Sequence, residues 1–344
     1  MVSSMSFLAV LWFFLIFVLI AGYFVLDGFD LGVGVLYRAL AKNESERALL
    51  RRSIGPVWDG NEVWLLTAGG ALFAAFPAAY ATTFSGFYLA VMLVLFGLIV
   101  RAVSLEFRAH DPQWGRAWDA CFVVGSFLPA LLLGVTLGNV IAGIPMAANG
   151  DYAGIPLLGL LSPFTLTAGL LGFAMCLSAG AAWAALKVRQ GSDVHARAEK
   201  LRRSFQIAAI VVFALATVLV FVVVRPEFAP GMLAASAVFA VAFVGCMAAS
   251  IALGGKGADL PAFILQSVAA VCLVALSATT LFPNLVVAAP GSVGASITLM
   301  SAASSDASLA WMTGIACVGV PLVLVYHVIA YRVFAGRLDD EGVA

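Results

Sequence analysis

Four acidic residues stand in two short motifs whose other members are mostly apolar or small. Asp27 and Asp30 lie three residues apart in LDGFDLGVG, and Asp59 and Glu62 have the same spacing in WDGNEVW. Residues three apart on a helix share one face, so each pair would project from one side of its helix. Carboxyl groups are costly in apolar surroundings, so the pattern indicates a functional role for these acids.

The positions of these acids relative to basic residues predict their depth. Asp30 precedes Arg38 by eight residues, and Asp59 follows Arg52 by seven. At about 1.5 Å per residue, the two acids would lie about 12 Å and about 10 Å from the ends of their helices. A charged side chain inside a bilayer costs on the order of 2.5–3.5 kcal/mol. We find no Lys or Arg at this depth, which favours a functional role over a structural one for Asp30 and Asp59.

Two further acids, Glu106 and Asp119, are expected at the same end of the next two helices. A structural role is equally open for both, because Arg101 could pair with Glu106, and Asp119 could cap its helix. Six acids thus converge on one end of the first four helices, while the later helices carry no carboxylate within the membrane.

The histidines and cysteines give little support for a cofactor or metal held by this chain. His110 and His195 fall in charged loops, so only His327 lies in an apolar segment, and the five cysteines are scattered singly. A hydrogen-bonded histidine at the membrane interface is the favoured interpretation of His327 over an iron ligand. Methionine is another residue that could ligate haem. We expect no cofactor and no metal bound by this chain, and no catalytic residue.

The elements that must position the acids follow from composition. The chain has 344 residues, of which 63% are hydrophobic and only 10% charged, with a balanced charge that excludes a nucleic-acid-binding surface. Apolar runs of about 20 residues, long enough to cross a bilayer, recur throughout. They predict an all-α polytopic membrane protein forming a single domain, 1–344, with nine spans: 7–37, 56–80, 84–104, 119–143, 163–186, 205–224, 230–253, 261–282 and 309–334. The first four, about 7–143, carry the polar motifs, and the rest, about 163–334, are mainly scaffold.

The basic residues predict the orientation of the chain. With nine spans, seventeen of the 18 Lys and Arg residues fall on one side, and only Arg225 falls on the other. Positively charged loops stay on the cytoplasmic side, so we expect the N-terminus outside and the C-terminus in the cytoplasm.

The acidic motifs resemble those of subunit II of the bacterial cytochrome bd quinol oxidases, including the cyanide-insensitive branch. The resemblance covers about residues 20–140 in detail and the remainder more loosely. Its motifs are DGFDLGVG from Asp27, the run from Ser53 to Pro77 with WDGNEVWL and TAGGALFAAFP, SGFY from Ser85, the Arg101 region, Trp118-Asp119, and GSF from Gly125.

This resemblance implies two four-helix bundles plus one peripheral helix, and a heterodimer with subunit I. Subunit I would carry haem b and haem d and oxidise ubiquinol or menaquinol, reducing oxygen to water without pumping protons. The implied location is the bacterial plasma (inner) membrane. Lipid, quinone and a small single-helix accessory subunit are further implied partners.

The resemblance also implies roles for individual residues. Asp30, Asp59 and Glu106 match acids of a cytoplasmic proton path, with Asp27 and Glu62 accessory to it; relatives commonly have Asp where this chain has Glu106. Trp64 matches a residue that lines an oxygen tunnel in some relatives, although a core aromatic at a helix interface is an equal interpretation. Two alternative functions stay open, a proton-coupled membrane transporter and an inert scaffold subunit.

Overall fold

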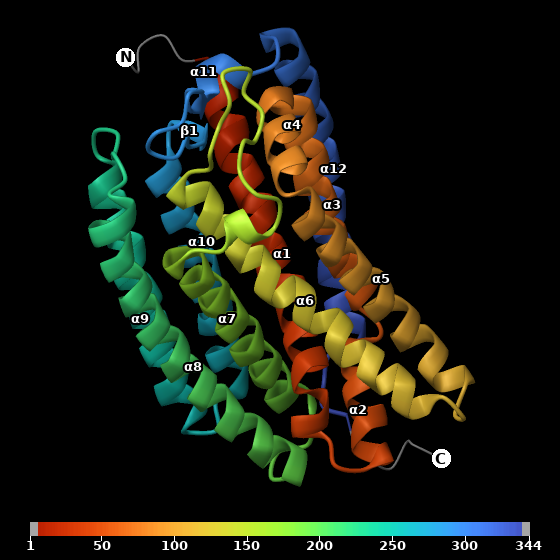
Figure 1. Cartoon of the computed structure of the whole chain (residues 1–344). Coiled ribbons are helices and arrows are strands. Elements are labelled where there is room, and N and C mark those ends of the chain that lie inside the picture. The colour runs from red at the N-terminus through yellow and green to blue at the C-terminus, as the bar shows by residue number, and fades with distance from the viewer. Residues whose placement is uncertain (1–5, 339–344) are drawn as a thin grey trace.

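The computed structural model describes residues 6–338, and this part of the chain is dominated by long helices (Figure 1). The helices are α1 (Phe7–Leu40), α2 (Glu44–Ile54), α3 (Trp58–Ala75), α4 (Pro77–Gly86), α5 (Tyr88–His110), α6 (Gly115–Ala142), α7 (Pro163–Lys187), α8 (Asp193–Leu219), α9 (Met232–Gly254), α10 (Asp259–Leu281), α11 (Leu299–Ala302) and α12 (Asp306–Val333). A 3₁₀ turn, η2 (Leu158–Leu160), precedes α7, and a π-helical turn, η3 (Val220–Val224), extends α8. Two short strands, β1 (Asn284–Val286) and β2 (Ile297–Thr298), pair antiparallel.

Within residues 6–338, eight helices are long and apolar enough to cross a membrane. They are α1, α5, α6, α7, α8 with η3, α9, α10 and α12, and they correspond to eight of the nine expected spans. The largest difference in bounds is at α8, which begins at Asp193 rather than 205, because its charged first three turns continue the helix beyond the apolar segment.

The remaining expected span, 56–80, is divided into two helices. Phe76 has φ −138° and ψ 66°, outside the helical region, and Pro77 begins α4. Proline disfavours the helical conformation of the residue before it and has no N–H for the helix ladder, which explains the break. The span is therefore interrupted, and α3 alone does not reach the length and hydropathy of the other eight helices.

Helix α1 lies between two groups of helices and packs against α3, α6, α7 and α10 (Figure 1). Its closest approach is to α7, at Gly32 and Gly180. A Cβ atom on Gly32 would lie 1.9 Å from the carbonyl oxygen of Cys176, so only glycine permits this crossing. Close packing through small residues is the usual way in which helices associate in membranes.

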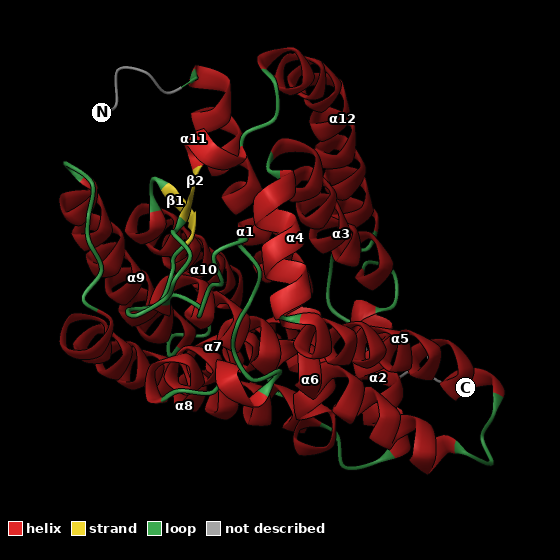
Figure 2. Cartoon of the chain, turned by 45° about the horizontal axis from the view of Figure 1, so that its top comes forward, coloured by secondary structure: helices red, strands yellow, loops and turns green. Residues whose placement is uncertain are grey.

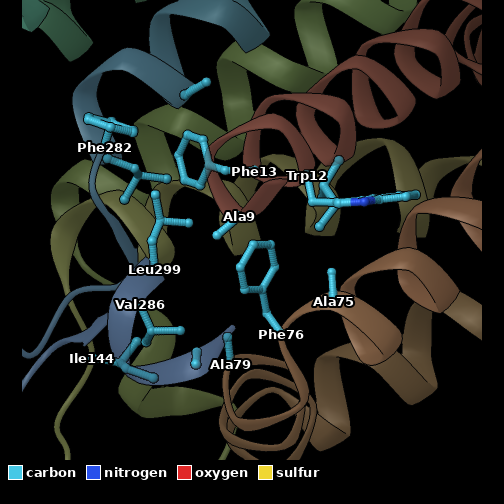
Figure 3. Packing of buried hydrophobic residues seen from close by; sticks show 14 of the residues in the cluster. Ala9, Trp12, Phe13, Ala75, Phe76, Ala79, Ile144, Phe282, Val286 and Leu299 are labelled. Carbon is cyan, nitrogen blue, oxygen red and sulfur yellow. The ribbon is translucent and has the colours of Figure 1, made fainter. Parts of the chain in front are cut away.

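Buried apolar side chains fill the end of the molecule at which α1 begins (Figure 3). Trp12 and Phe13 of α1 meet Phe76 at the break between α3 and α4, and Phe282 at the end of α10. The β1–β2 hairpin, α4 and α11 gather at the same end (Figure 2). The break in the second span is thus covered by the core rather than left open.

Helix α12 runs in the same direction as α1. At one end, Ser6 Oγ donates to Asp306 Oδ1 at 2.6 Å, and Trp12 Nε1 donates to the Thr313 hydroxyl at 3.0 Å. At the other end, the N–H of Leu338 donates to the carbonyl of Lys187, the last residue of α7. Between these attachments most of α12 is exposed, as expected for a peripheral helix.

Candidate functional site: a buried acid cluster

Arg101 of α5 is the centre of a polar cluster inside the helical core. Its side chain is fully buried, and Nη2 donates to Asp27 Oδ1 of α1 at 2.7 Å and to Glu62 Oε1 of α3. Three helices therefore meet at one guanidinium group. The expectation that no cation lies at the depth of the acids is wrong, as is the pairing of Arg101 with Glu106.

Asp30 belongs to the same cluster but has a neutral partner. Its Oδ2 accepts a hydrogen bond from Asn61 Nδ2 at 2.7 Å, and Asn61 Oδ1 accepts one from the hydroxyl of Tyr331 on α12 at 3.0 Å. Asp30 is fully buried, and no basic residue among 6–338 lies within ion-pair distance of it. A buried ionised carboxylate without a cation is costly, so Asp30 is the acid of this cluster whose charge is least compensated.

Several buried polar atoms of the cluster have no hydrogen-bond partner within the described part of the chain. They are the Tyr23 hydroxyl, Asp27 Oδ2, Asp30 Oδ1, and Arg101 Nε and Nη1. Buried polar groups of this kind are usually satisfied by water, which makes these atoms the places where water would bind. Water bound there would connect Asp27 to Asp30.

The position of Arg101 depends on a close crossing of α5 and α6. A Cβ on Gly125 of α6 would lie 2.7 Å from the backbone nitrogen of Arg101 and equally close to the carbonyl oxygen of Gly97. Contact between the two backbones leaves no room for side chains at the crossing. The long arginine side chain can then reach only toward α1 and α3, where the acids are.

The other two expected proton-path residues do not contact the cluster directly. Asp59 lies one turn before Glu62 and is exposed on the surface of α3, and Glu106 is exposed five residues beyond Arg101 on α5. Glu62 is intermediate, with 25% of its side chain accessible. The acids thus form a series in which Asp27 and Asp30 are inside, Glu62 is half-buried, and Asp59 and Glu106 face outward.

Asp119 has a structural role of a different kind from the expected helix cap. It lies in the second turn of α6 and forms ion pairs with Arg108 at 2.9 Å and Arg47 at 3.2 Å. Arg108 also pairs with Glu44 of α2, a helix that the sequence analysis did not predict. These pairs join α2, α5 and α6 at the basic end of the molecule.

His327 of α12 has both ring nitrogens in hydrogen bonds. Nδ1 lies 2.8 Å from the carbonyl of Val323, and Nε2 accepts from Trp64 Nε1 at 3.3 Å. His195 lies 3.0 Å from Asp259, and His110 lies 3.0 Å from the Glu106 carbonyl. These arrangements do not fit an axial haem ligand. Trp64 packs on Gly22 of α1, where a Cβ would lie 2.2 Å from its ring.

One group of side chains has ligand atoms close enough for a metal ion: His195, Glu199 and Asp259, within 4.8 Å of one another. The cations needed there are already supplied by arginines. Asp259 accepts from Arg202 at 3.2 Å and from Arg337 at 2.7 Å. The group is better described as an ion-pair cluster that attaches the C-terminal segment to α8 and α10.

Sequence reasoning missed three members of the acid cluster: Arg101, Asn61 and Tyr331. For Arg101 a signal was present, since it precedes Arg108 by seven residues, the same spacing that gave the depth of Asp59. Asn61 stands inside the WDGNEVW motif, between the two acids. Tyr331 carries no such signal, because its contact depends on where the last helix packs.

Comparisons with known proteins show to which family the chain that carries this cluster belongs. A sequence model of the family described as cytochrome bd terminal oxidase subunit II matches residues 8–334. The chain belongs to this family. It is therefore an integral membrane protein and a subunit of a haem-bearing terminal oxidase complex, with a subunit I as its partner.

Individual bd oxidase relatives agree along nearly the whole chain. The cytochrome bd-I ubiquinol oxidase subunit 2 of Escherichia coli K12 is 34% identical over 97% of this chain and 96% of its own length. The cytochrome bd ubiquinol oxidase subunit 2 of Bacillus subtilis 168 is 32% identical over 96% of this chain and 97% of its own. A chain of the bd oxidase structure from Geobacillus thermodenitrificans superposes with a TM-score of 0.77 at 16% identity, covering 96% of this chain and 99% of that chain, which shows a common fold.

Proposed function

We propose that this subunit supplies the proton path of a quinol:oxygen oxidoreductase whose redox centres lie in subunit I. Protons would enter at Glu106, Asp59 and Asp30 would be the inner relay, and Asp27 and Glu62 would be accessory. Oxygen reduction consumes protons, and carboxyl groups connected by water can carry them through an apolar interior. The substrates would be ubiquinol or menaquinol and oxygen.

The observation that carries this proposal is the imbalance of charge around Arg101. Arg101 pairs with Asp27 and Glu62, and Asp30 lies in the same cluster with the neutral Asn61 as its partner, so three carboxyl groups share one cation. A group built only for stability would pair its charges, whereas an excess of buried acid can hold and exchange protons. Asp59 and Glu106, on the same two helices as Glu62 and Arg101, extend the acids toward the surface.

The membrane arrangement that we propose has nine crossings, with α3 and α4 together forming the interrupted one. The parallel course of α1 and α12 supports an odd number. The concentration of Lys and Arg at the ends of these two helices supports a cytoplasmic C-terminus and an outside N-terminus. The arrangement would comprise two four-helix bundles with α12 peripheral, forming one domain in the bacterial inner membrane.

The surface that we propose for subunit I is the outer face of α3. Asp59 is exposed there, and a carboxylate directed at lipid would be costly, so a protein surface is expected to cover it. Gly70 lies on the same face, and apart from its own turn of helix no atom among residues 6–338 lies within 4 Å of its Cβ position. Small residues let a second helix approach closely. Haem b and haem d would belong to subunit I, and a single-helix accessory subunit, quinone and lipid would complete the complex.

The test is oxygen uptake with a quinol donor by the purified complex carrying Asp30→Asn or Asp59→Asn. We expect haem spectra like those of the wild type and turnover lower on the order of tenfold or more, because the relay loses a group that binds a proton. The matched control is Asp193→Asn, an exposed acid in the first turn of α8.

Normal turnover with full haem content in both variants would reject the proton path and favour the scaffold function. Trp64→Phe would test the oxygen tunnel in the same assay, where a tunnel predicts a raised KM for oxygen at unchanged haem content.

A further inference from the structure

A second polar feature lies at the basic end of the molecule. It is a cavity of about 240 Å³ between the end of α2 with the connection to α3, the end of α7 and the end of α12. Its floor is buried and includes Ser53, Trp183 and Lys187, and its rim includes the exposed Arg52 and Phe334. We call it the Lys187 cavity.

The charge of the Lys187 cavity is uncompensated. Lys187 is only 7% exposed, and its Nζ donates to the carbonyl of Phe334 and lies 5.3 Å from the centre of the Trp183 ring. Neither contact is a negative charge, and no acidic residue lines the cavity among residues 6–338. An ammonium group that is more than nine-tenths buried needs an anion nearby.

The remaining polar groups of the cavity are already engaged. The Ser53 hydroxyl donates to the Leu50 carbonyl, Trp183 Nε1 donates to the Ser53 carbonyl, and Tyr331 donates to Asn61. Only the ammonium of Lys187 and the guanidinium of Arg52 are left to bind a ligand. A site with these two donors selects an anion such as a phosphate group.

The rim of the cavity shows which kind of phosphate fits. Val333, the last residue of α12, is 68% exposed, and Phe334, which follows it, is 49% exposed. Val333, Ile329 and Val325 continue as exposed apolar surface along α12, which is suited to acyl chains. Basic pockets beside aromatic residues at the cytoplasmic ends of helices bind phospholipid headgroups.

We propose that the Lys187 cavity binds the headgroup of an anionic phospholipid from the leaflet at the basic end of the helices. Its phosphate contacts Lys187 and Arg52, and its acyl chains lie along the exposed side of α12. The lipid thereby joins α12 to α2 and α7. The cavity shares Tyr331 with the acid cluster, but the two cationic groups proposed to bind the phosphate belong to neither the cluster nor the proton path.

The experiment is a titration of the delipidated oxidase complex with phosphatidylglycerol, followed by native mass spectrometry. We expect Lys187→Gln and Arg52→Gln each to weaken the tightest phosphatidylglycerol site on the order of tenfold, because each removes a charged hydrogen bond. Lys187→Arg should retain the site. Arg203→Gln removes an exposed charge at the same end and should leave binding unchanged. Since Arg52 is exposed, its variant remains informative even if Lys187→Gln does not fold.

Three results would overturn the proposal. Equal binding of phosphatidylethanolamine would remove the argument from charge. Displacement of phosphatidylglycerol by equimolar inorganic phosphate would identify a free-anion site instead. The third concerns Asp339, Asp340 and Glu341, which follow Leu338 in the sequence and lie outside the described residues. If phosphatidylglycerol bound only after these acids were changed to amides, the chain itself would supply the anion.

Discussion

One nitrogen of Arg101 pairs with two acids, so replacing the arginine would leave both carboxyl groups without a cation. Nη2 is the atom that contacts both Asp27 and Glu62. Without it, two carboxyl groups would remain in a region from which bulk water is largely excluded. Asp30 would keep its hydrogen bond to Asn61, so only Asp27 and Glu62 would lose an ion-pair partner.

We predict that Arg101→Met destabilises the complex by about 3–5 kcal/mol, the usual cost of breaking a buried ion pair. The measurement is the melting temperature of the purified complex. Combining Arg101→Met with Asp27→Asn and Glu62→Gln should recover much of the loss, because no unpaired charge is then left. An Arg101→Met complex that melts like the wild type would contradict the buried pairs.

At the residue scale, the sequence predicted the placement of the acids on their helices better than it predicted their partners. Spacing along a helix is sufficient to place Asp27 beside Asp30 and to estimate depth. It says nothing about rotation of one helix against another, which decides that Arg101 faces Glu62 and that Tyr331 reaches Asn61. Asp59 and Glu62 share a motif, yet three residues of helix separate an exposed side chain from a half-buried one.

Among the elements, the crossing of α1 and α7 has the least tolerance for added atoms. Gly28 and Gly32 are one turn apart on α1, but they differ in their surroundings. A Cβ on Gly28 would have its nearest neighbour at 3.9 Å, the sulfur of Cys176, whereas a Cβ on Gly32 would collide with the backbone of α7. The pair therefore provides a matched test of the crossing.

We predict that Gly32→Ala destabilises the subunit by about 1–3 kcal/mol, the usual cost of forcing an extra group into a packed core. Gly28→Ala should have little effect. Thermal denaturation and the yield of assembled complex are the measurements. Equal melting temperatures for the two variants would show that the helices do not cross at Gly32.

The elements themselves were largely predictable, with two instructive exceptions. Eight apolar segments became single helices because twenty apolar residues have few alternatives in a membrane. Pro77 should have predicted the break in the second span. Helix α2 was missed because its mostly polar sequence shows no apolar run, and it is positioned by ion pairs such as Glu44 with Arg108.

On the scale of the whole molecule, the exposed faces of the helices differ in what must cover them. Gly70 on α3 and Gly245 on α9 are both exposed, with no atom of the described chain near their Cβ positions. Only α3 also exposes a carboxylate, that of Asp59. This difference is the basis of our proposal that α3 faces the partner subunit and α9 faces lipid.

We predict that Gly70→Trp prevents co-purification of the haem-bearing partner, while Gly245→Trp leaves the complex intact. A Trp on α3 would separate two closely packed helices, whereas lipid accommodates the same side chain on α9. Haem content per purified subunit is the measurement. Assembly of both variants, or of neither, would contradict the assignment of faces.

The hydrogen bond from Tyr331 to Asn61 joins residues 270 positions apart, and that from Trp12 to Leu309 joins residues 297 apart. A ribosome adds about 5–20 residues per second, so the partners of Trp12 and Asn61 are synthesised tens of seconds after them. During that interval the side chains of Asn61 and Trp12 lack the hydrogen-bond partners that the last helix will supply. The acid cluster is therefore completed last, when α12 inserts, and the proton path that we propose could form only once α12 has been made.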